Sequence, residues 1–287
     1  MTAWAERVRA LRTGIAAARR RSPAVDAAFE TIERDSDLGG AILAGALAYR
    51  LFLFALPLAF FLVSGAGLMA NALGIEPNLI PKSVGFTGVI TKQVASESNG
   101  SSSWWVALSS FFIVAYATRV LFRAIAIVHA LAWDRSAASV KIKSRALGMF
   151  GAMLATEIAL GAGVGAINHQ TAIGGLVALA LYVFASAGLW LVISLHVPHG
   201  NARLIELIPG SLLYGIGVAA VSLFNVLILG SLIKSKSSTY GTLGIAATLL
   251  LGFFFVGRIM VGAAVVNATL HERRIRLQAT PPLLQEK

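Results

Sequence analysis

The chain has 287 residues, of which 57% are hydrophobic and only 13% charged, and its mean hydropathy is +0.77. These values exclude a soluble domain of this length and indicate a polytopic membrane protein. The formal net charge of +11 comes from basic residues in loops and tails beside apolar segments, a pattern more typical of membrane orientation than of nucleic-acid binding. Cysteine is absent, which excludes a disulfide framework.

Residues 1–37 lack the apolar stretch of a signal peptide and are charged throughout. Trp4, Val8, Leu11 and Ile15 recur at helical spacing, while arginines occupy other positions. The pattern predicts an amphipathic basic helix on the cytoplasmic side. Such a helix either lies on an anionic leaflet or is a solvated helix that follows the orientation rule, and both interpretations stay open.

Six apolar segments follow, each of about 20 residues or more, which is enough to cross a bilayer. Pro57 interrupts the first segment without ending it, because neighbouring helices in a membrane can satisfy the carbonyl that a proline frees. We therefore predict an all-α membrane domain over residues 38–271 and a cytoplasmic tail over 272–287. The expected spans are residues 38–73, 104–133, 146–167, 173–195, 207–233 and 243–270.

The basic residues outside these spans are distributed unequally between the two sides of the membrane. If the N-terminus is cytoplasmic, 16 Lys and Arg lie on the cytoplasmic side and 4 on the other. Basic residues accumulate in cytoplasmic loops, so both termini are predicted to be cytoplasmic.

Small residues recur at every fourth position of the fifth expected span, at Ser211, Gly215 and Ala219. Such a stripe lets two helix backbones approach closely, because packing rather than hydrophobicity drives helix association in lipid. We expect a packing face within the chain, with a dimer interface as the less favoured alternative.

Several stretches resemble the YihY/BrkB family of bacterial inner-membrane proteins, and they occur in that family's order and spacing. No single motif is decisive, and the resemblance covers essentially residues 30–275. The family-like positions are Tyr49 and Pro57 in LAGALAYRLFLFALPLAFFLV, Pro209 and Gly210 in LIPGSLL, Tyr240 and Gly241 in STYGTLG, and then Gly262, Ala263 and Asn267.

The resemblance implies a six-helix protein of the bacterial inner membrane with both ends in the cytoplasm. Members of the family are linked to envelope integrity, to serum resistance and to lipid or lipopolysaccharide transport. The chain departs from the family pattern at Phe54, where a serine is usual, and at Ala264 and Val265, where an acidic residue is usual. A mechanism that uses that carboxylate is therefore closed to this member.

Five ionisable residues lie inside the expected spans: Arg50, Arg119, Arg123, Glu157 and Arg258. Counted from the cytoplasmic ends, all except Arg123 share a depth of roughly 17 to 21 Å at about 1.5 Å per residue. A charge at that depth costs at least about 2.5 to 3.5 kcal/mol. We expect Arg50, Arg119 and Arg258, together with Glu157, to bind an anionic substrate in a water-accessible cavity. The alternative is a structural pair with Glu157 and arginines that reach the headgroups.

The sequence offers no arrangement for catalysis, neither a Ser-His-Asp order, a GxSxG motif, a Walker loop nor a carboxylate pair within a loop. The ribonuclease BN label once attached to the family would need clustered acids or a His pair on a soluble face. His196 and His199 could form half a metal site, but only Glu206 lies near them, so we expect interfacial histidines. We expect no enzymatic activity, no metal and no cofactor.

The sequence therefore predicts a protein that transports or accommodates an anionic lipid or amphiphile. The expected partners are membrane lipids with anionic headgroups and a protein partner or second copy of the chain, but no nucleic acid. One alternative is a scaffold that binds an envelope complex through the basic N-terminal helix. Another is a small-ion channel or exporter, whose pore would need a polar stripe that the apolar fourth span is not expected to offer.

Overall fold

The structure is a computed structural model that describes residues 2–73, 103–141, 144–167, 172–224 and 230–279. Helices dominate these residues, and no strand occurs among them, so the all-α prediction is confirmed. The helices are α1 (Thr2–Arg21), α2 (Pro23–Asp37), α3 (Gly40–Leu73), α5 (Ser103–Ala132), α6 (Ser144–Ile167), α7 (Ala172–His196), α8 (Leu204–Phe224) and α9 (Gly230–Ala279), with a 3₁₀ turn, η2, at Ala137–Ser139.

Five of the described helices, α3, α5, α7, α8 and α9, are long and apolar enough to cross a membrane. Each corresponds to one of the expected spans. The third expected span coincides with α6, whose side chains beyond Glu157 lie outside the described part. The count of six spans therefore stays a prediction, whereas five helices able to cross a membrane are present in the described part of the chain.

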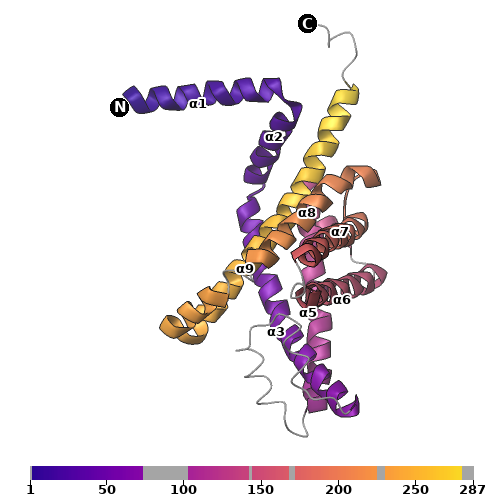
Figure 1. Cartoon of the computed structure of the whole chain (residues 1–287). Coiled ribbons are helices and arrows are strands. Elements are labelled where there is room, and N and C mark those ends of the chain that lie inside the picture. Colours follow the sequence, from indigo (N-terminus) through magenta and orange to yellow (C-terminus); the bar gives the residue numbers. More distant parts are fainter. Residues whose placement is uncertain (1, 74–102, 142–143, 168–171, 225–229, 280–287) are drawn as a thin grey trace.

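The N-terminal region forms two helices rather than one, and α1 runs at a large angle to α2 (Figure 1). The break has a local cause, because Pro23 begins α2 and the Ser22 hydroxyl caps it by accepting a hydrogen bond from the Val25 N–H. Ile15 is exposed, and the side chains of the other three residues of the predicted apolar face lie outside the described part. The amphipathic character of α1 stays a prediction.

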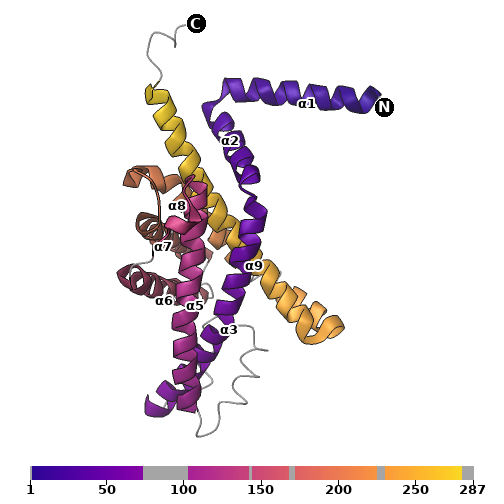
Figure 2. The same cartoon turned by 180° about the vertical axis from the view of Figure 1, so that it is seen from behind.

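Two long helices, α3 and α9, cross each other in the middle of the molecule, and α5 runs antiparallel beside α3 (Figures 1 and 2). The crossing is close because Gly257 has no side chain: an added Cβ would lie 2.6 Å from the carbonyl oxygen of Ala44. On the other side, α7 and α8 pack against each other and α8 packs on α9.

The predicted packing face on α8 is confirmed. A Cβ added to Gly215 would overlap the carbonyl oxygen of Val183 and lie 3.0 Å from the Cβ of Ala187, both on α7. Ser211 and Ala219, one turn to either side, are buried. The stripe therefore brings two helices of the same chain together.

Large apolar side chains cover the outer faces of the bundle as well as its core. Trp190 and Val261 are fully buried, whereas Phe112 on α5 and Phe184 on α7 are 63% and 67% exposed. Water would oppose so extensive an apolar surface, but lipid tails do not. The outer faces therefore fit a protein surrounded by lipid.

Candidate functional site

Arg258 on α9 has an ion-pair partner within the chain. Its two terminal nitrogens each donate a hydrogen bond to one carboxylate oxygen of Asp35, both at 2.7 Å. Asp35 lies near the end of α2. Its carboxylate packs against Gly40, because a Cβ added to Gly40 would overlap it. This planar two-bond geometry is the strongest form of Arg–carboxylate pairing. The charge of Arg258 is therefore matched within the protein.

The backbone of Arg258 lies next to the beginning of α3, because its neighbour Gly257 contacts Ala44. The depth predicted for Arg258 assumes that its helix leaves the membrane at the end of the expected span, residue 270. In the structure α9 continues unbroken to Ala279. A count along one helix does not measure depth when that helix is tilted and extends beyond its apolar part.

Ion pairs tie α2 to the C-terminal part of α9. Asp26 and Glu30 bind Arg273 at 2.7 and 2.8 Å, and Glu30 also pairs with Arg276. Arg34 binds Glu272 at 2.6 Å. We call the end of the bundle formed by α2, the first turn of α8 and residues 271–276 of α9 the charged end.

Two further contacts complete the charged end. Glu206, in the first turn of α8, accepts from His271 at 2.6 Å and pairs with Arg274. Where α1 meets α2, Arg19 binds Asp26 at 2.8 Å. The guanidiniums of Arg19 and Arg273 hold the pKa of the Asp26 carboxyl below its usual value of 3.8.

Arg50, Arg119 and Arg123 are in a different situation. All three are exposed, and none forms an ion pair with another described residue. The rings of Phe61 on α3 and Phe111 on α5 lie 6.0 Å apart. The two helices run antiparallel, so positions equally far from this contact lie at the same height. Arg50 is 11 residues before Phe61, and residue 122, between Arg119 and Arg123, is 11 residues after Phe111. Arg50 therefore lies level with the segment between Arg119 and Arg123.

The Glu157 carboxyl accepts a hydrogen bond from a serine hydroxyl. Its Oε1 accepts a hydrogen bond of 2.8 Å from the Ser186 hydroxyl on α7, and its Oε2 is enclosed without a hydrogen-bond partner. The described contacts bring none of the arginines to ion-pair distance of Glu157. Arg50, Arg119, Arg258 and Glu157 therefore form no single cluster here, and their predicted role in substrate binding stays a prediction.

A polar stripe on α7 was missed by the sequence reasoning. Tyr182, Ser186, Trp190 and Ser194 recur at every fourth position and are all at least 92% buried. The expectation that this span offers no polar stripe was wrong. The spacing was a readable signal, because residues four apart lie on one face of a helix, but the high overall hydropathy of the segment hid it.

The stripe meets polar and aromatic groups from two neighbouring helices. The Trp190 ring stacks on Tyr214 of α8 at 4.2 Å and lies 5.5 Å from the His129 ring of α5. The Trp190 N–H, the Ser194 hydroxyl and His129 Nε2 are buried without a hydrogen-bond partner. Each such atom costs about 1 to 3 kcal/mol if nothing binds it.

The family-like positions on α8 and α9 meet in one contact. The Gly210 N–H donates a 2.7 Å hydrogen bond to the Asn267 side-chain oxygen, and a Cβ on Gly210 would overlap the carbonyl oxygen of Ala263. Gly262 is less constrained, since its nearest neighbour would be Leu213 at 3.9 Å. The family-like residues Gly210, Ala263 and Asn267 therefore hold α8 against α9.

The other family-like positions lie elsewhere on α3, α8 and α9. Tyr49 is 54% exposed on α3, and Pro57 and Pro209 lie inside α3 and α8. Tyr240 and Gly241 lie on α9, with their side chains outside the described part.

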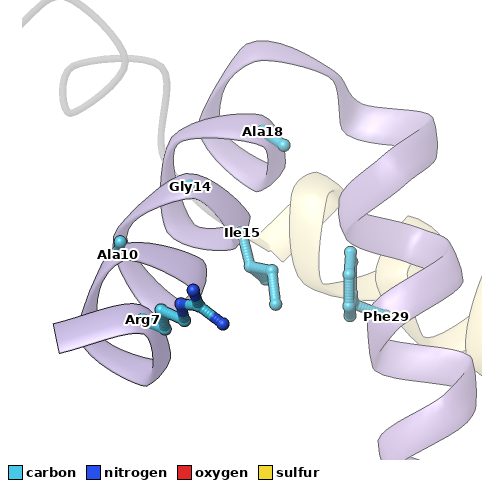
Figure 3. A pocket seen from close by; sticks show the side chains of 6 residues that line it. All are labelled: Arg7, Ala10, Gly14, Ile15, Ala18 and Phe29. Carbon is cyan, nitrogen blue, oxygen red and sulfur yellow. The ribbon is translucent and has the colours of Figure 1, made fainter. Parts of the chain in front are cut away.

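A groove of about 690 Å³ lies between α1 and α2. Ile15 and Phe29 face each other across it, and Arg7 lies at its edge (Figure 3). The lining is largely apolar, and Arg7 adds a positive charge at one end. The groove is open to the surroundings and separate from the membrane-spanning helices.

The fold defines a multi-pass, all-helical membrane protein whose last two helices are joined by the Gly210–Asn267 contact. A family model described as Virulence factor BrkB matches residues 32–285, so the chain belongs to this family, as the sequence resemblance indicated. The match includes every family-like position and the ion-paired Asp35. No curated protein and no solved structure matches the chain.

Proposed function

We propose that the protein transports or accommodates an anionic lipid or related amphiphile in the bacterial inner membrane, and thereby contributes to envelope integrity without enzymatic activity. Both termini and the charged end then lie in the cytoplasm, in keeping with the unequal distribution of Lys and Arg. The observation that carries the proposal is the exposed set Arg50, Arg119 and Arg123 inside apolar helices.

These arginines need an anion that the described part of the chain does not provide. A guanidinium within the hydrocarbon region costs at least about 2.5 to 3.5 kcal/mol unless it is solvated or paired. A phosphate oxygen pair matches the planar guanidinium fork in the same way as a carboxylate. A lipid whose phosphate is drawn toward Arg50 and Arg119 would match their charge while its acyl chains cover the exposed aromatic side chains beside them.

Arg258 and Glu157 have other roles in this account. The Asp35 carboxylate already occupies both nitrogens of the Arg258 fork, so this pair connects α2 to α9. Glu157 would repel a phosphate if it were ionised. We therefore assign the headgroup to the exposed arginines and treat the Arg258 pair as structural.

A second candidate, a scaffold for an envelope complex, is favoured by the groove between α1 and α2. Apart from its junction with α2, α1 makes few contacts with the rest of the chain. The groove presents Ile15 and Phe29 beside the basic Arg7, a combination that suits an amphipathic segment of a protein partner or of a second copy.

Native mass spectrometry of the detergent-purified protein tests the lipid proposal. Arg50→Gln and Arg119→Gln should each reduce co-purifying anionic lipid roughly 10- to 100-fold, because a charge-assisted hydrogen bond contributes about 1.5 to 3 kcal/mol. Arg203→Gln, an exposed arginine just before α8, is the matched control and should retain wild-type lipid. Equal retention in all four proteins would refute the proposal and leave the scaffold as the better account.

A further inference from the structure

Glu157 is an isolated acid within an apolar helix. It is the one acidic residue in the 24 residues of α6. One carboxyl oxygen accepts from Ser186 at 2.8 Å, and the other is enclosed without a partner. This environment differs from that of Asp35 and Glu206, which both meet cationic side chains.

Among the described residues, the groups around Glu157 on the packed helices do not supply a positive charge. On α7 it faces Ser186, with Tyr182 one turn away in one direction and Trp190 one turn away in the other, where Trp190 stacks on Tyr214 of α8. On α5, Arg119 and Arg123 point to an exposed face and form no ion pair with it. An ionised carboxylate without a counter-charge in a low-dielectric interior costs several kcal/mol, whereas the protonated acid does not.

A series of polar groups connects this carboxyl to the charged end. Ser186 is followed after one turn by Trp190, beside His129, and after another turn by Ser194, close to the end of α7 at His196. Hydrogen-bonding atoms of Trp190, His129 and Ser194 are buried and unpartnered. Water molecules bound to these atoms would satisfy them and would form a hydrogen-bonded chain about two helical turns long.

We infer that Glu157 is a reversible proton-binding site, loaded from the charged end through water held along the α7 stripe. The ligand is a proton, which the carboxyl takes up through this water and returns by the same route as the pH rises. Within the described residues, α6 packs mainly on α7 and to a smaller extent on α5. A reversible proton site would let a proton gradient act on the protein, which lipid binding alone does not explain. The site does not depend on the arginines.

Labelling with dicyclohexylcarbodiimide, which reacts with protonated carboxyls in apolar surroundings, tests the protonation. In purified protein at neutral pH, mass spectrometry of the peptides should find the adduct on Glu157 and not on the ion-paired Asp35 or Glu206. Labelling should fall as the pH is raised, and Glu157→Gln should abolish the adduct. A Glu157 that labels no faster than Asp35, or whose labelling is independent of pH, would overturn the inference.

Hydrogen–deuterium exchange of the Glu157 carboxyl, followed by its infrared C=O band after transfer to D₂O, tests the route. Trp190→Phe keeps the stacking ring but removes the N–H, and Ser194→Ala removes the hydroxyl, so both should slow exchange several-fold. Thr156→Val is the matched control, since Thr156 is exposed on α6 and bonds only its own helix. Exchange at the wild-type rate in both stripe variants would refute the route. If Arg50→Gln or Arg119→Gln loses the bound lipid but keeps the exchange rate of Glu157, the proton site is shown to be independent of the lipid site.

Discussion

Helices α9 and α7 both bury polar side chains, but most of those on α9 have a partner on another helix, with the Thr269 hydroxyl as an exception, whereas several on α7 have none. On α9, Arg258 meets Asp35, Asn267 meets the Gly210 N–H and His271 meets Glu206. On α7, Trp190 and Ser194 have buried polar atoms without partners. A matched polar group inside a bundle indicates a contact that specifies the fold. An unmatched one is a position that water or a ligand can satisfy.

The largest expected effect is on the α8–α9 contact. Gly210→Val would place a branched side chain against the backbone of Ala263, which cannot yield as a side chain could. We expect a loss of about 3 kcal/mol or more in unfolding free energy, at the upper end for overpacking. Thermal unfolding in detergent measures it, with Gly262→Ala as a control that should change little because its Cβ meets only Leu213. Similar loss in both would contradict the role of this contact.

A somewhat smaller loss is expected when the Arg258 pair is broken. Asp35→Ala leaves a guanidinium without its partner, and removing one member of a fully buried pair costs about 3 to 5 kcal/mol. The Arg258 side chain is 38% exposed, so solvent screening reduces the expected loss to about 1 to 3 kcal/mol. The double variant Asp35→Ala with Arg258→Leu should recover part of it. A single variant as stable as the wild type would show that the pair is dispensable.

A much smaller change in stability is expected on α7. Ser194→Ala removes a buried hydroxyl that has no partner in the protein, so its unfolding free energy should stay within about 1 kcal/mol of the wild type or rise. The same thermal assay measures the change. A loss as large as that of Asp35→Ala would mean that Ser194 has a structural partner, and the contrast between α7 and α9 would fail.

The smallest effect concerns pH at the junction of α1 and α2. The depressed pKa of Asp26 means that its pairing with Arg19 and Arg273 stabilises the junction above about pH 3.8, and that this contribution is lost as the pH falls below that value. Spin labels on α1 and α2 should therefore report a wider distance distribution in acid. Asp26→Asn should show that wider distribution already at neutral pH. An unchanged distance in both would contradict the assignment.

Hydropathy predicted the membrane helices well, because the length of an apolar run is a local property. It did not predict that α9 would extend from Gly230 to Ala279, since a polar helical extension leaves no apolar signal. The break between α1 and α2 was readable from Ser22 and Pro23, a hydroxyl cap followed by a proline that fits the first turn.

The candidate site was harder to predict because its decisive contacts join distant parts of the chain. Asp35 and Arg258 are 223 positions apart, and nothing in either segment alone indicates the other. The sequence singled out every charge inside the spans but could not tell matched from unmatched ones. The α7 stripe could have been found from its four-residue spacing. Whether the polar atoms of Trp190 and Ser194 have partners depends on which side chains the fold places around α7.

One paired measurement tests the distinction between matched and unmatched charges most directly. Arg258→Gln and Arg119→Gln remove one guanidinium each, and both unfolding temperature and bound anionic lipid are measured for the two purified variants. The account predicts that Arg258→Gln lowers the unfolding temperature and keeps the lipid, and that Arg119→Gln keeps the unfolding temperature and loses the lipid. The reverse pattern, or the same change in both variants, would contradict it.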